Sequence, residues 1–504
     1  MITRLKIDGF KNLVKVDIRF GPFTCIAGTN AVGKSNLFDA LKFISDLTEK
    51  TLLDAAKSVR SEGQKNSDIR GLFHRIGDNY AEQMRFEIEM IIPKEGVDEL
   101  GQTATATITT VRYTLVLALK KEDILSNDGP LEILVEELVP ITQTEARRSI
   151  AFDHKKAWTD SVFQGRRSTQ APFISTERDG PERIIKFHQD GGSSGKPILR
   201  KASQLPKTVL STAWDASQNP TALIVKNEMQ SWQMLQLEPS ALRKPDEFFA
   251  ISSARLSADG SHLPATLYRL KVENDKTFEK PNIYQLLANR LSELIGDVST
   301  IDIDKDDKRE LLTLMLTSKD GTRHPARALS DGTLRFLGLA VLELDQQLSG
   351  VICLEEPENG IHPEKIKAVI KLLQDMSMKT NYPFEKDNPL RQVIINTHSP
   401  AVVQQVPEDS LLMAELQEDV SDNNMHYKRA VFSPLKDTWR TRMPDFNGRT
   451  ASLNKLLSYL NPTDFSDTDE YDGTSTDELF ERAEKKKRVI DRSDVQKQLS
   501  ILFQ

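Results

Sequence analysis

The sequence predicts an α/β fold, and three observations carry this prediction. An apolar strand at residues 23–27 leads through a glycine-bounded loop into a helix whose apolar residues recur at helical spacing. Two further apolar strands, at 351–354 and 392–396, each end in polar or charged residues, and a predicted helix separates them. In open α/β sheets the carboxyl ends of the strands form the ligand-binding edge, so the same pattern predicts where a site lies.

The other elements follow in chain order. Alternating apolar and polar residues predict strands at 2–7 and 14–20, and the segment from about 85 to 210 is typical of an antiparallel sheet with hairpins. Helical spacing dominates 219–298, without the heptads that a long coiled coil requires. Beyond it we expect strands at 299–303 and 311–317, and helices at 333–348 and from about 363.

These elements divide the chain into four predicted parts. They are an N-terminal lobe at 1–210 with an antiparallel β subdomain, a short helical insertion at 211–298, a C-terminal lobe at 299–440 and an extension at 441–504. Within the extension, residues 464–481 hold eight acidic residues and no basic one, which is typical of a solvated linker. The simplest interpretation of the basic run at 485–488, which follows the linker, is a solvated helix face.

Composition excludes several classes of protein. The 504 residues are 38% hydrophobic and 28% charged, without the ~18 consecutive apolar residues of a membrane span. The first residues lack the apolar core of a signal peptide, so we expect a cytoplasmic protein with no membrane partner. The two cysteines, Cys25 and Cys353, lie inside apolar runs and predict neither a disulfide nor a metal site.

The net charge of -7 argues weakly against a surface dedicated to nucleic-acid binding. Residues 147–207 nevertheless carry thirteen Lys or Arg against six acids, a pattern that fits either solvated hairpins or phosphate contact.

The strongest chemical signal begins at Gly28, where the chain reads GTNAVGKS. This is the G-x-x-x-x-G-K-S phosphate loop, and it lies between a predicted strand and a predicted helix, which disfavours an ordinary glycine-rich turn. Backbone N–H groups of such a loop wrap a phosphate, Lys34 reaches the β and γ oxygens, and the Ser35 hydroxyl joins a Mg²⁺ shell. The residues expected to bind the nucleotide here are Asn30, Ala31, Val32, Gly33, Lys34, Ser35 and Asn36.

Two strand ends carry the candidate catalytic groups. The strand at 351–354 ends in Glu355 and Glu356, where the first carboxylate can support Mg²⁺ and the second can orient or deprotonate a water. The strand at 392–396 delivers His398 to the same predicted edge of the sheet. Taken alone, the carboxylates could belong to a polar loop, and the histidine could be a core residue with its hydrogen bonds satisfied. Beside a phosphate loop, all three predict a catalytic site.

A fourth motif is LSDGT at 329–333, a serine and glycine turn that opens an amphipathic helix. A helix N-terminus with a hydroxyl binds anions, yet the phosphate loop already serves one nucleotide. The motif therefore predicts a site completed across a dimer by Ser330 and Gly332, the alternative being a plain serine N-cap.

Together these residues resemble the ABC-type ATPase heads of the SMC, RecF and OLD group, a P-loop NTPase fold. The phosphate loop, the signature turn LSDGT, the Walker B stretch CLEEPE with the D-loop-like NGIHP, and the switch histidine in NTHSP match in order and form. The resemblance covers residues 1–210 and 290–440. It implies that Lys34 and Ser35 bind phosphate and Mg²⁺, that Glu356 activates water, that His398 senses the γ-phosphate, and that Ser330 and Gly332 cap the partner's ATP.

The resemblance also extends to the opening IDGFKNL and has limits. It implies that Lys11 and Asn12 line the adenine or phosphate side of the nucleotide. Glu355 stands where SMC proteins usually have aspartate, no glutamine is assigned to the Q-loop, and the insertion is too short for an SMC coiled coil. No Toprim nuclease pattern follows His398, so we expect the chain to lack a nuclease of its own.

Two functions remain open from the sequence. The first is an ATP-dependent switch that dimerises, or forms a higher oligomer, through ATP-sandwiched heads. It would control a separate effector, a nuclease, in bacterial anti-phage defence, because compact heads without Toprim resemble the ATPase subunits of systems such as Septu. The alternative is a RecF-like DNA-repair or chromosome-maintenance ATPase that binds duplex DNA. A non-hydrolysing scaffold is disfavoured by the presence of both Glu356 and His398.

Overall fold

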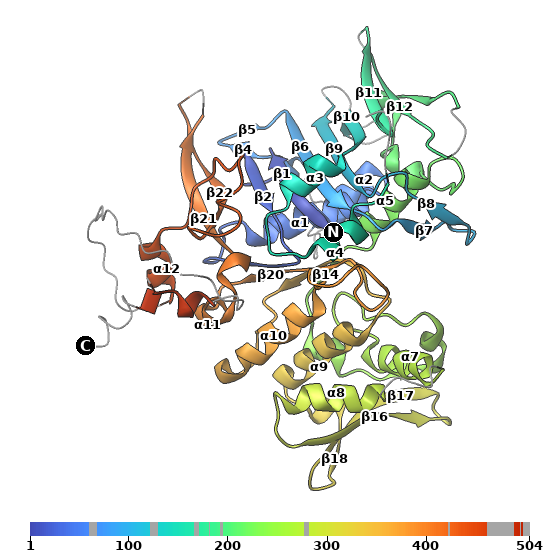
Figure 1. Cartoon of the computed structure of the whole chain (residues 1–504), viewed down its shortest axis with the longest axis vertical. Helices are drawn as coiled ribbons and strands as arrows, with labels where there is room; N and C mark the ends of the chain where they lie inside the picture. The colour runs from blue at the N-terminus through green and yellow to red at the C-terminus, as the bar shows by residue number, and fades with distance from the viewer. Residues whose placement is uncertain are drawn as a thin grey trace.

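The computed structural model describes residues 1–59, 68–120, 130–165, 171–180, 182–191, 195–276, 282–421, 424–460, 488–493 and 495–496. A parallel sheet runs through the middle of the molecule, with a large antiparallel sheet on one side and a mainly helical lobe on the other (Figure 1). This arrangement confirms the predicted α/β fold with an antiparallel subdomain. The acidic linker at 464–481 and residues 485–487 of the basic run lie outside the described residues.

The central sheet has six strands. Four neighbouring pairs are parallel, and only the last pair is antiparallel. All residues of its two inner strands β20 and β3 are buried, as expected of a sheet covered on both faces. The order is β14 (Gln233–Leu235), β19 (Gly350–Glu355), β20 (Arg391–Thr397), β3 (Phe23–Ala27), β21 (Leu411–Val420) and β22 (His426–Pro434).

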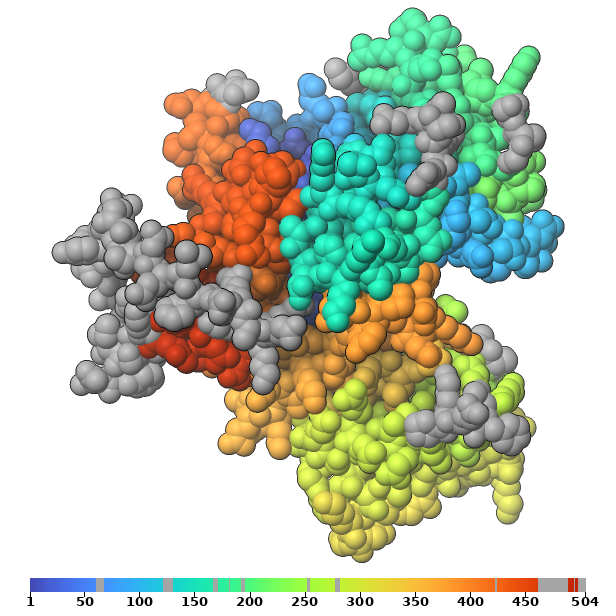
Figure 2. All heavy atoms as spheres, in the orientation of Figure 1, coloured from blue at the N-terminus to red at the C-terminus, as the bar shows by residue number. Residues whose placement is uncertain are grey.

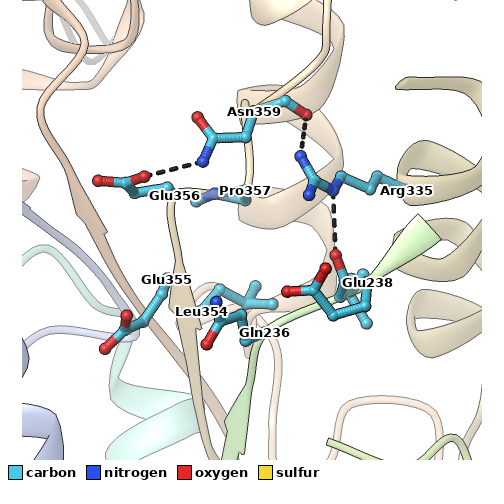
Figure 3. A pocket seen from close by; sticks show the side chains of 9 residues that line it. Gln236, Glu238, Arg335, Leu354, Glu355, Glu356, Pro357 and Asn359 are labelled. Carbon is cyan, nitrogen blue, oxygen red and sulfur yellow. Dashed lines mark hydrogen bonds between the residues drawn. The ribbon is translucent and has the colours of Figure 1, made fainter. Parts of the chain in front are cut away.

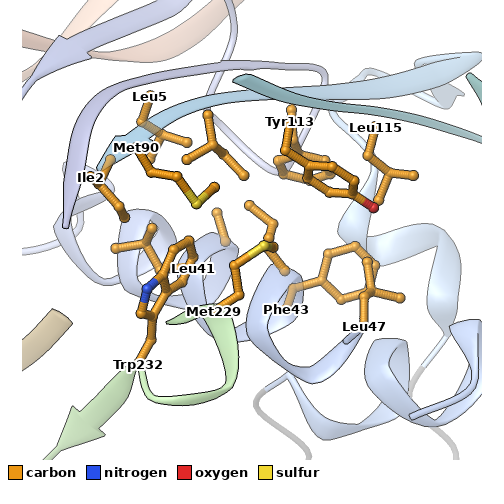
Figure 4. Close-up of a cluster of buried hydrophobic side chains, with 14 of the residues drawn as sticks. Ile2, Leu5, Leu41, Phe43, Leu47, Met90, Tyr113, Leu115, Met229 and Trp232 are labelled. Atoms are coloured by element: carbon orange, nitrogen blue, oxygen red, sulfur yellow. The ribbon is translucent and has the colours of Figure 1, made fainter. Parts of the chain in front are cut away.

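An eight-stranded antiparallel sheet forms the upper lobe in Figure 1. Helix α1 (Lys34–Asp46) packs between this sheet and the central one, and Phe43 and Leu41 lie in the first of two large cores with Met229 of α5 (Pro220–Gln230) (Figure 4). The strand order is β13 (Ile198–Lys201), β12 (Glu182–Phe187), β11 (Ile174–Asp179), β10 (Leu131–Pro140), β9 (Thr110–Leu119), β6 (Gln83–Ile91), β1 (Ile2–Asp8) and β2 (Val16–Arg19).

The second large core lies on the opposite face of the central sheet. Its helices are α7 (Leu263–Asp275), α8 (Ile283–Ser292), α9 (Asp331–Leu344), α10 (Ile366–Met376), α11 (Pro400–Gln405) and α12 (Leu453–Leu460). A small antiparallel sheet supports them, formed by β15 (Asp246–Glu247), β16 (Val298–Asp306), β17 (Leu311–Ser318) and β18 (Arg323–Pro325). The shorter elements are α2 (Leu52–Ser58), α6 (Pro239–Leu242), β4 (Arg75–Ile76), β5 (Asn79–Tyr80), β7 (Glu95–Val97) and β8 (Thr103–Thr105).

Two parts of the chain differ from the sequence-based expectation. Helices α3 (Gln143–Ser149) and α4 (Lys156–Val162) interrupt the segment expected to be all strands, and the side chain of Thr142 caps α3 by accepting from Glu145 N at 3.2 Å. Strand β14 lies inside the segment expected to be helical, where it forms the edge of the central sheet. The four-part domain division therefore stays a prediction, since α5 and β14 pack outside the helical lobe.

A smaller third core joins the two lobes. Trp158 of α4 is fully buried, and its indole N–H lies 3.0 Å from Met378 Sδ. Backbone and side-chain bonds reinforce the contact, since Lys155 N donates to Thr380 O at 3.0 Å and Phe384 N to Ser161 Oγ at 2.7 Å. In Figure 2 the teal surface of α3 and α4 meets the orange surface of residues 378–390 here. Among the described helices none is long and apolar enough to cross a membrane.

We expect Trp158→Ala to lower the free energy of unfolding by about 3–5 kcal/mol, because it opens a cavity where the lobes meet. Urea denaturation followed by circular dichroism measures this loss. Trp214→Ala is the matched control: its side chain is 59% exposed, so its effect should stay within about 0.5 kcal/mol. Equal effects of the two variants would contradict the role of the third core.

Candidate active site

Three strand ends meet at one edge of the central sheet. In the parallel register Thr397 of β20 lies beside Ala27 of β3, and Asn396 lies beside Glu355 of β19. The loops that follow are tied together directly, since Gly28 N donates to Thr397 O at 3.3 Å and Glu356 N to Asn396 O at 3.1 Å. The phosphate loop, the paired carboxylates and the histidine are thus brought to the same edge, as the sequence predicted.

The phosphate loop takes a backbone shape that few side chains permit. Gly33 has φ +108° and Ala31 has φ +66°, both in the left-handed region that favours glycine. At Gly28 an added Cβ would lie 2.4 Å from Ala414 O, so a larger residue would displace the loop. Gly33 begins α1 with no side chain capping the helix. Its first-turn N–H groups are therefore available to an anion.

Lys34 lies folded against this loop. Its ammonium donates to Gly28 O at 2.6 Å and to Thr29 O at 2.8 Å, and the residue is 6% exposed. Burial lowers the pKa of Lys34, although the charges of Glu356, Glu358 and Glu355 act in the opposite direction. The lysine is a buried cation whose present partners are two carbonyls, which phosphate oxygens could replace.

Residues of the β1–β2 turn brace the loop from outside. Asn12 Nδ2 donates to Val32 O at 3.2 Å, and Asn12 Oδ1 accepts from Asn36 Nδ2 at 2.8 Å. Lys11 pairs with Asp39 on α1 at 2.7 Å. Both residues therefore lie beside the phosphate loop and α1, and their side chains bond to groups of the protein there. Contact of Lys11 and Asn12 with a nucleotide stays a prediction. Of the other predicted loop residues, Asn30 and Ala31 are exposed, Val32 is buried, and Ser35 and Asn36 are half-buried in the first turn of α1.

Glu356 is oriented by two neighbours. Its carboxylate accepts from Asn359 Nδ2 at 2.8 Å and lies 2.6 Å from His398 Nδ1, while its backbone has φ +45°. Burial raises the pKa of Glu356, but the hydrogen bonds from Asn359 and His398 and the charges of His398 and Lys34 outweigh it, so the pKa is lowered overall. The carboxylate is consequently ionised at neutral pH and able to accept a proton.

Glu358 is a residue of the same loop that the sequence analysis did not select. Its Oε1 accepts from Thr397 Oγ1, whereas Oε2 is buried and has no hydrogen-bond partner within the described residues. Burial raises the pKa of Glu358, against the opposing bond from Thr397. The third acid of CLEEPE was visible as a letter, but its burial depends on β20, which lies elsewhere in the sequence.

A small pocket opens beside Glu355 and Glu356 (Figure 3). Gln236 and Leu237, just after β14, line it together with Arg335. Gln236 follows the strand that pairs with β19, so it is the candidate for the glutamine that the sequence alone did not place. The only sequence signal is the pair of apolar residues Met234 and Leu235 before the glutamine, which is too short to indicate a strand reliably.

Ser330 and Gly332 lie at the start of α9, which belongs to the lower lobe, whereas the phosphate loop leads into α1 in the upper lobe (Figure 1). Ser330 is exposed and its hydroxyl caps α9, accepting from Thr333 N at 3.3 Å. Gly332 is buried against the D-loop-like segment, where an added Cβ would meet Gly360 O at 2.3 Å. The structure thus shows a capped helix N-terminus facing outward, and the role of both residues toward a partner's nucleotide stays a prediction.

The carboxylates at the carboxyl end of β19 could hold a divalent cation if a bound nucleotide supplied further ligands. The described part of the chain contains no group of three or more His, Cys, Asp or Glu side chains that could hold a metal ion by itself. Mg²⁺ in nucleotide sites typically takes one or two protein oxygens and completes its shell with phosphate oxygens and water. Ser35 and Glu355, at the start of α1 and the end of β19, fit that limited demand.

The chain is similar to known protein families and to individual proteins. A family model described as "AAA domain, putative AbiEii toxin, Type IV TA system" matches residues 194–404, and a second model described as "AAA domain" matches residues 4–191. DNA replication and repair protein RecF of Clavibacter sepedonicus is 27% identical over 125 residues, which are 25% of this chain and 29% of the relative. RecF of Porphyromonas gingivalis is 35% identical over 74 residues, 14% of this chain and 20% of the relative.

Solved structures similar to the chain are SMC heads. An SmcHead bound to the C-winged helix domain of ScpA aligns over 86% of this chain and 98% of its own, with 14% identity and a TM-score of 0.44. The SMC head domain from Thermotoga maritima aligns over 86% and 99%, with 13% identity and a TM-score of 0.36. The aligned segments span less than a third of the curated RecF relatives. The two AAA-domain models, the partial RecF matches and the motifs gathered at one sheet edge support an SMC/RecF-like ABC-type ATPase.

Proposed function

We propose that the chain binds ATP with Mg²⁺ and hydrolyses it to ADP and phosphate. The observation that carries this proposal is the Glu356 carboxylate, held by Asn359 and His398 at the sheet edge that also holds the phosphate loop. A scaffold that only bound nucleotide would not need an ionised, oriented carboxylate there. Lys34 and the backbone of residues 30–36 bind the phosphates, and Asn12 keeps the loop in shape.

The roles of the remaining side chains follow from their positions. Ser35 and Glu355 would hold Mg²⁺, which supplies charge neutralisation at the β and γ phosphates when bound. Glu356, which its lowered pKa keeps ionised, orients the attacking water and takes its proton. His398 fixes the carboxylate through the 2.6 Å contact and lies where it can sense the γ-phosphate. Gln236 faces the same acids from β14.

We propose further that two chains sandwich ATP between their heads. Ser330 is exposed at the N-terminus of a fourteen-residue helix of the lower lobe, whereas the phosphate loop leads into α1 of the upper lobe. A helix N-terminus of this length favours an anion, so a partner's γ-phosphate is a suitable occupant. Each nucleotide would then be bound by the phosphate loop of one head and the signature turn of the other, in a homodimer or a larger oligomer.

The dimer is proposed to regulate a separate effector, a nuclease, in bacterial anti-phage defence. Support comes from the family description of residues 194–404, which names a toxin of a type IV toxin–antitoxin system, and from the absence of a Toprim pattern in the sequence after His398. This step rests on family likeness, whereas the nucleotide site rests on geometry.

The RecF-like alternative has its own support in the partial matches to DNA replication and repair proteins. Its weak point is the surface. The described parts of the basic stretch 147–207 lie apart, because α3 and α4 pack on residues 378–390 whereas β11–β13 lie at the far edge of the antiparallel sheet (Figure 1). Several of its cations are also neutralised locally, as in the pairs Arg147–Asp160 at 2.8 Å and Lys186–Glu177 at 2.6 Å.

We expect Glu356→Gln to bind ATP like the wild type and to hydrolyse it about 10²–10⁴-fold more slowly, because a positioned base contributes that factor. Lys34→Ala should instead lose binding, since it removes the buried cation of the loop. Nucleotide titration and phosphate release measure the two effects. Glu364→Gln, at an exposed carboxylate, is the matched control and should leave both unchanged. Wild-type turnover by Glu356→Gln would refute its role as the base.

We expect Ser330→Arg to bind ATP as a monomer but to fail in ATP-dependent dimerisation, because a bulky side chain would fill the helix N-terminus where the partner's phosphate docks. Sedimentation velocity in the Glu356→Gln background measures dimer formation. Ser292→Arg adds the same side chain to an exposed site on α8 and should dimerise normally. A dimer that forms with Ser330→Arg would leave Ser330 as a helix cap.

Duplex DNA binding separates the two proposed functions. If 147–207 contacts phosphates, affinity should fall with salt at a log–log slope of about −0.9 per contact, and the double variant Arg178→Ala, Arg200→Ala should reduce that slope by about two contacts. Both arginines are exposed on the β11–β13 edge. The control pair Lys308→Ala, Arg309→Ala lies on the turn between β16 and β17. No binding at low salt, with or without ATP, would exclude the RecF-like function.

A further inference from the structure

Two buried polar atoms near the active site have no hydrogen-bond partner within the described part of the chain. One is Oε2 of Glu358, and the other is the hydroxyl oxygen of Tyr459 on α12. The body of the Tyr459 side chain is only partly buried, whereas its hydroxyl oxygen is inaccessible. Buried polar atoms are nearly always satisfied by protein, water or ligand, so each of these atoms requires an explanation.

Helix α12 is firmly placed, although it follows the last strand of the central sheet by almost twenty residues. Its three buried leucines, Leu456, Leu457 and Leu460, join the second large core, and the helix packs on α11. Lys455 pairs with Glu415 of β21 at 2.7 Å. Just before the helix, Ala451 N donates to Pro434 O at 2.9 Å. These contacts hold α12 against the strand next to β3.

The placement brings Tyr459 to the beginning of the phosphate loop. β21 lies so close to that loop that an added Cβ at Gly28 would meet Ala414 O, the residue before Glu415. The electrostatic neighbours of the hydroxyl agree. Burial raises the pKa of Tyr459, Cys25 and Glu358 raise it further, and the Gly28 backbone opposes the shift. The hydroxyl therefore points at the carboxyl end of β3, on the side of the sheet that carries α11.

The Tyr459 hydroxyl and Glu358 Oε2 are not hydrogen-bonded to each other, although each can take part in a hydrogen bond. A phenol hydroxyl donates one hydrogen bond and accepts others, and a carboxyl oxygen accepts from water. Leaving such groups unpaired destabilises the folded chain, whereas a group that reached them would gain hydrogen bonds. Water suits both atoms, because it accepts from the Tyr459 hydroxyl and donates to the carboxyl oxygen of Glu358, whereas a phosphate oxygen suits the Tyr459 hydroxyl alone.

We propose that Tyr459 is a positioning residue of the nucleotide site, so that the C-terminal helix α12 completes the site by donating the Tyr459 hydroxyl to an oxygen beside Gly28 and Glu358. This inference rests on the proposed function, because the oxygen belongs either to the bound triphosphate or to a water that is ordered with it. The residue lies outside the four motifs and acts from the extension that follows both lobes.

Tyr459→Phe tests the proposal, because it removes one oxygen and keeps the ring that packs in the core. We expect an unchanged or slightly higher melting temperature, since an unpaired buried hydroxyl is lost. If the oxygen belongs to the triphosphate, the Kd for ATP should rise about tenfold; if it belongs to a water, kcat should fall about tenfold at constant Kd. Ser458→Ala, on the same helix with its hydroxyl bonded to Asn454 O at 2.9 Å, is the control.

Glu358→Gln and the double variant with Tyr459→Phe complete the cycle. If both side chains bind the same oxygen, their effects on Kd or kcat should be less than additive. The inference is overturned if the wild type binds ATP while Tyr459→Phe matches Ser458→Ala in both Kd and kcat, and the proposed function would then stand without it. Tighter binding by Tyr459→Phe would also overturn it, because the hydroxyl would then be an obstruction. A wild type that does not bind ATP would overturn both.

Discussion

The pairing of β3 between β20 and β21 is the constraint on which the site depends. The pairing of β3 with β20 joins residues about 370 positions apart. Its favourable contacts therefore have to offset the conformational entropy that the chain between them loses when its ends are brought together. Complete burial of both β3 and β20 provides the apolar contribution. Gln392 fixes the register, because its buried amide donates to Ile2 O and Gly21 O at 2.8 Å while its oxygen accepts from Ile2 N at 2.9 Å. A one-residue slip would break these bonds and separate Gly28 from Thr397.

At the edge built in this way, two glutamates two residues apart are driven in opposite directions. Glu356 receives hydrogen bonds from Asn359 and His398 and its pKa falls, whereas Glu358 is more deeply buried and its pKa rises. Neighbouring acids whose environments separate their pKa values can take different roles in one reaction. Ionised Glu356 is suited to accept a proton. Glu358 is suited to hold its neighbours in place through the bond from Thr397, and its second oxygen is buried with no hydrogen-bond partner within the described residues.

The sequence predicted the parts of this molecule that local signals encode. The phosphate loop, the strand ends at Glu356 and His398, and most strands of the antiparallel sheet have periodic or motif patterns that do not depend on distant residues. Helix α3 was missed although Thr142 and Glu145 form a capping pair, because the surrounding strands dominated the pattern. The three-residue β14 and the position of Tyr459 could not be predicted, since each is set by packing against strands far away in the chain.

The signature helix α9 is tied to the catalytic edge near its start and to the opposite end of β20 at its other end. Near its start Arg335 donates to Asn359 O at 2.6 Å, and the side chain of the same Asn359 holds Glu356. At its end the buried guanidinium of Arg391, the first residue of β20, donates to Asp345 O at 2.6 Å and Leu348 O at 2.9 Å. A contact path therefore runs from the carboxylate to the helix that presents Ser330. This path can signal that ATP is bound only if ATP favours one arrangement of Asn359 over another. Coupling between two sites requires that a ligand binds one of two states more tightly. The rigid packing of Gly332 on Gly360 means that such a shift would move the outward-facing turn and the catalytic loop together.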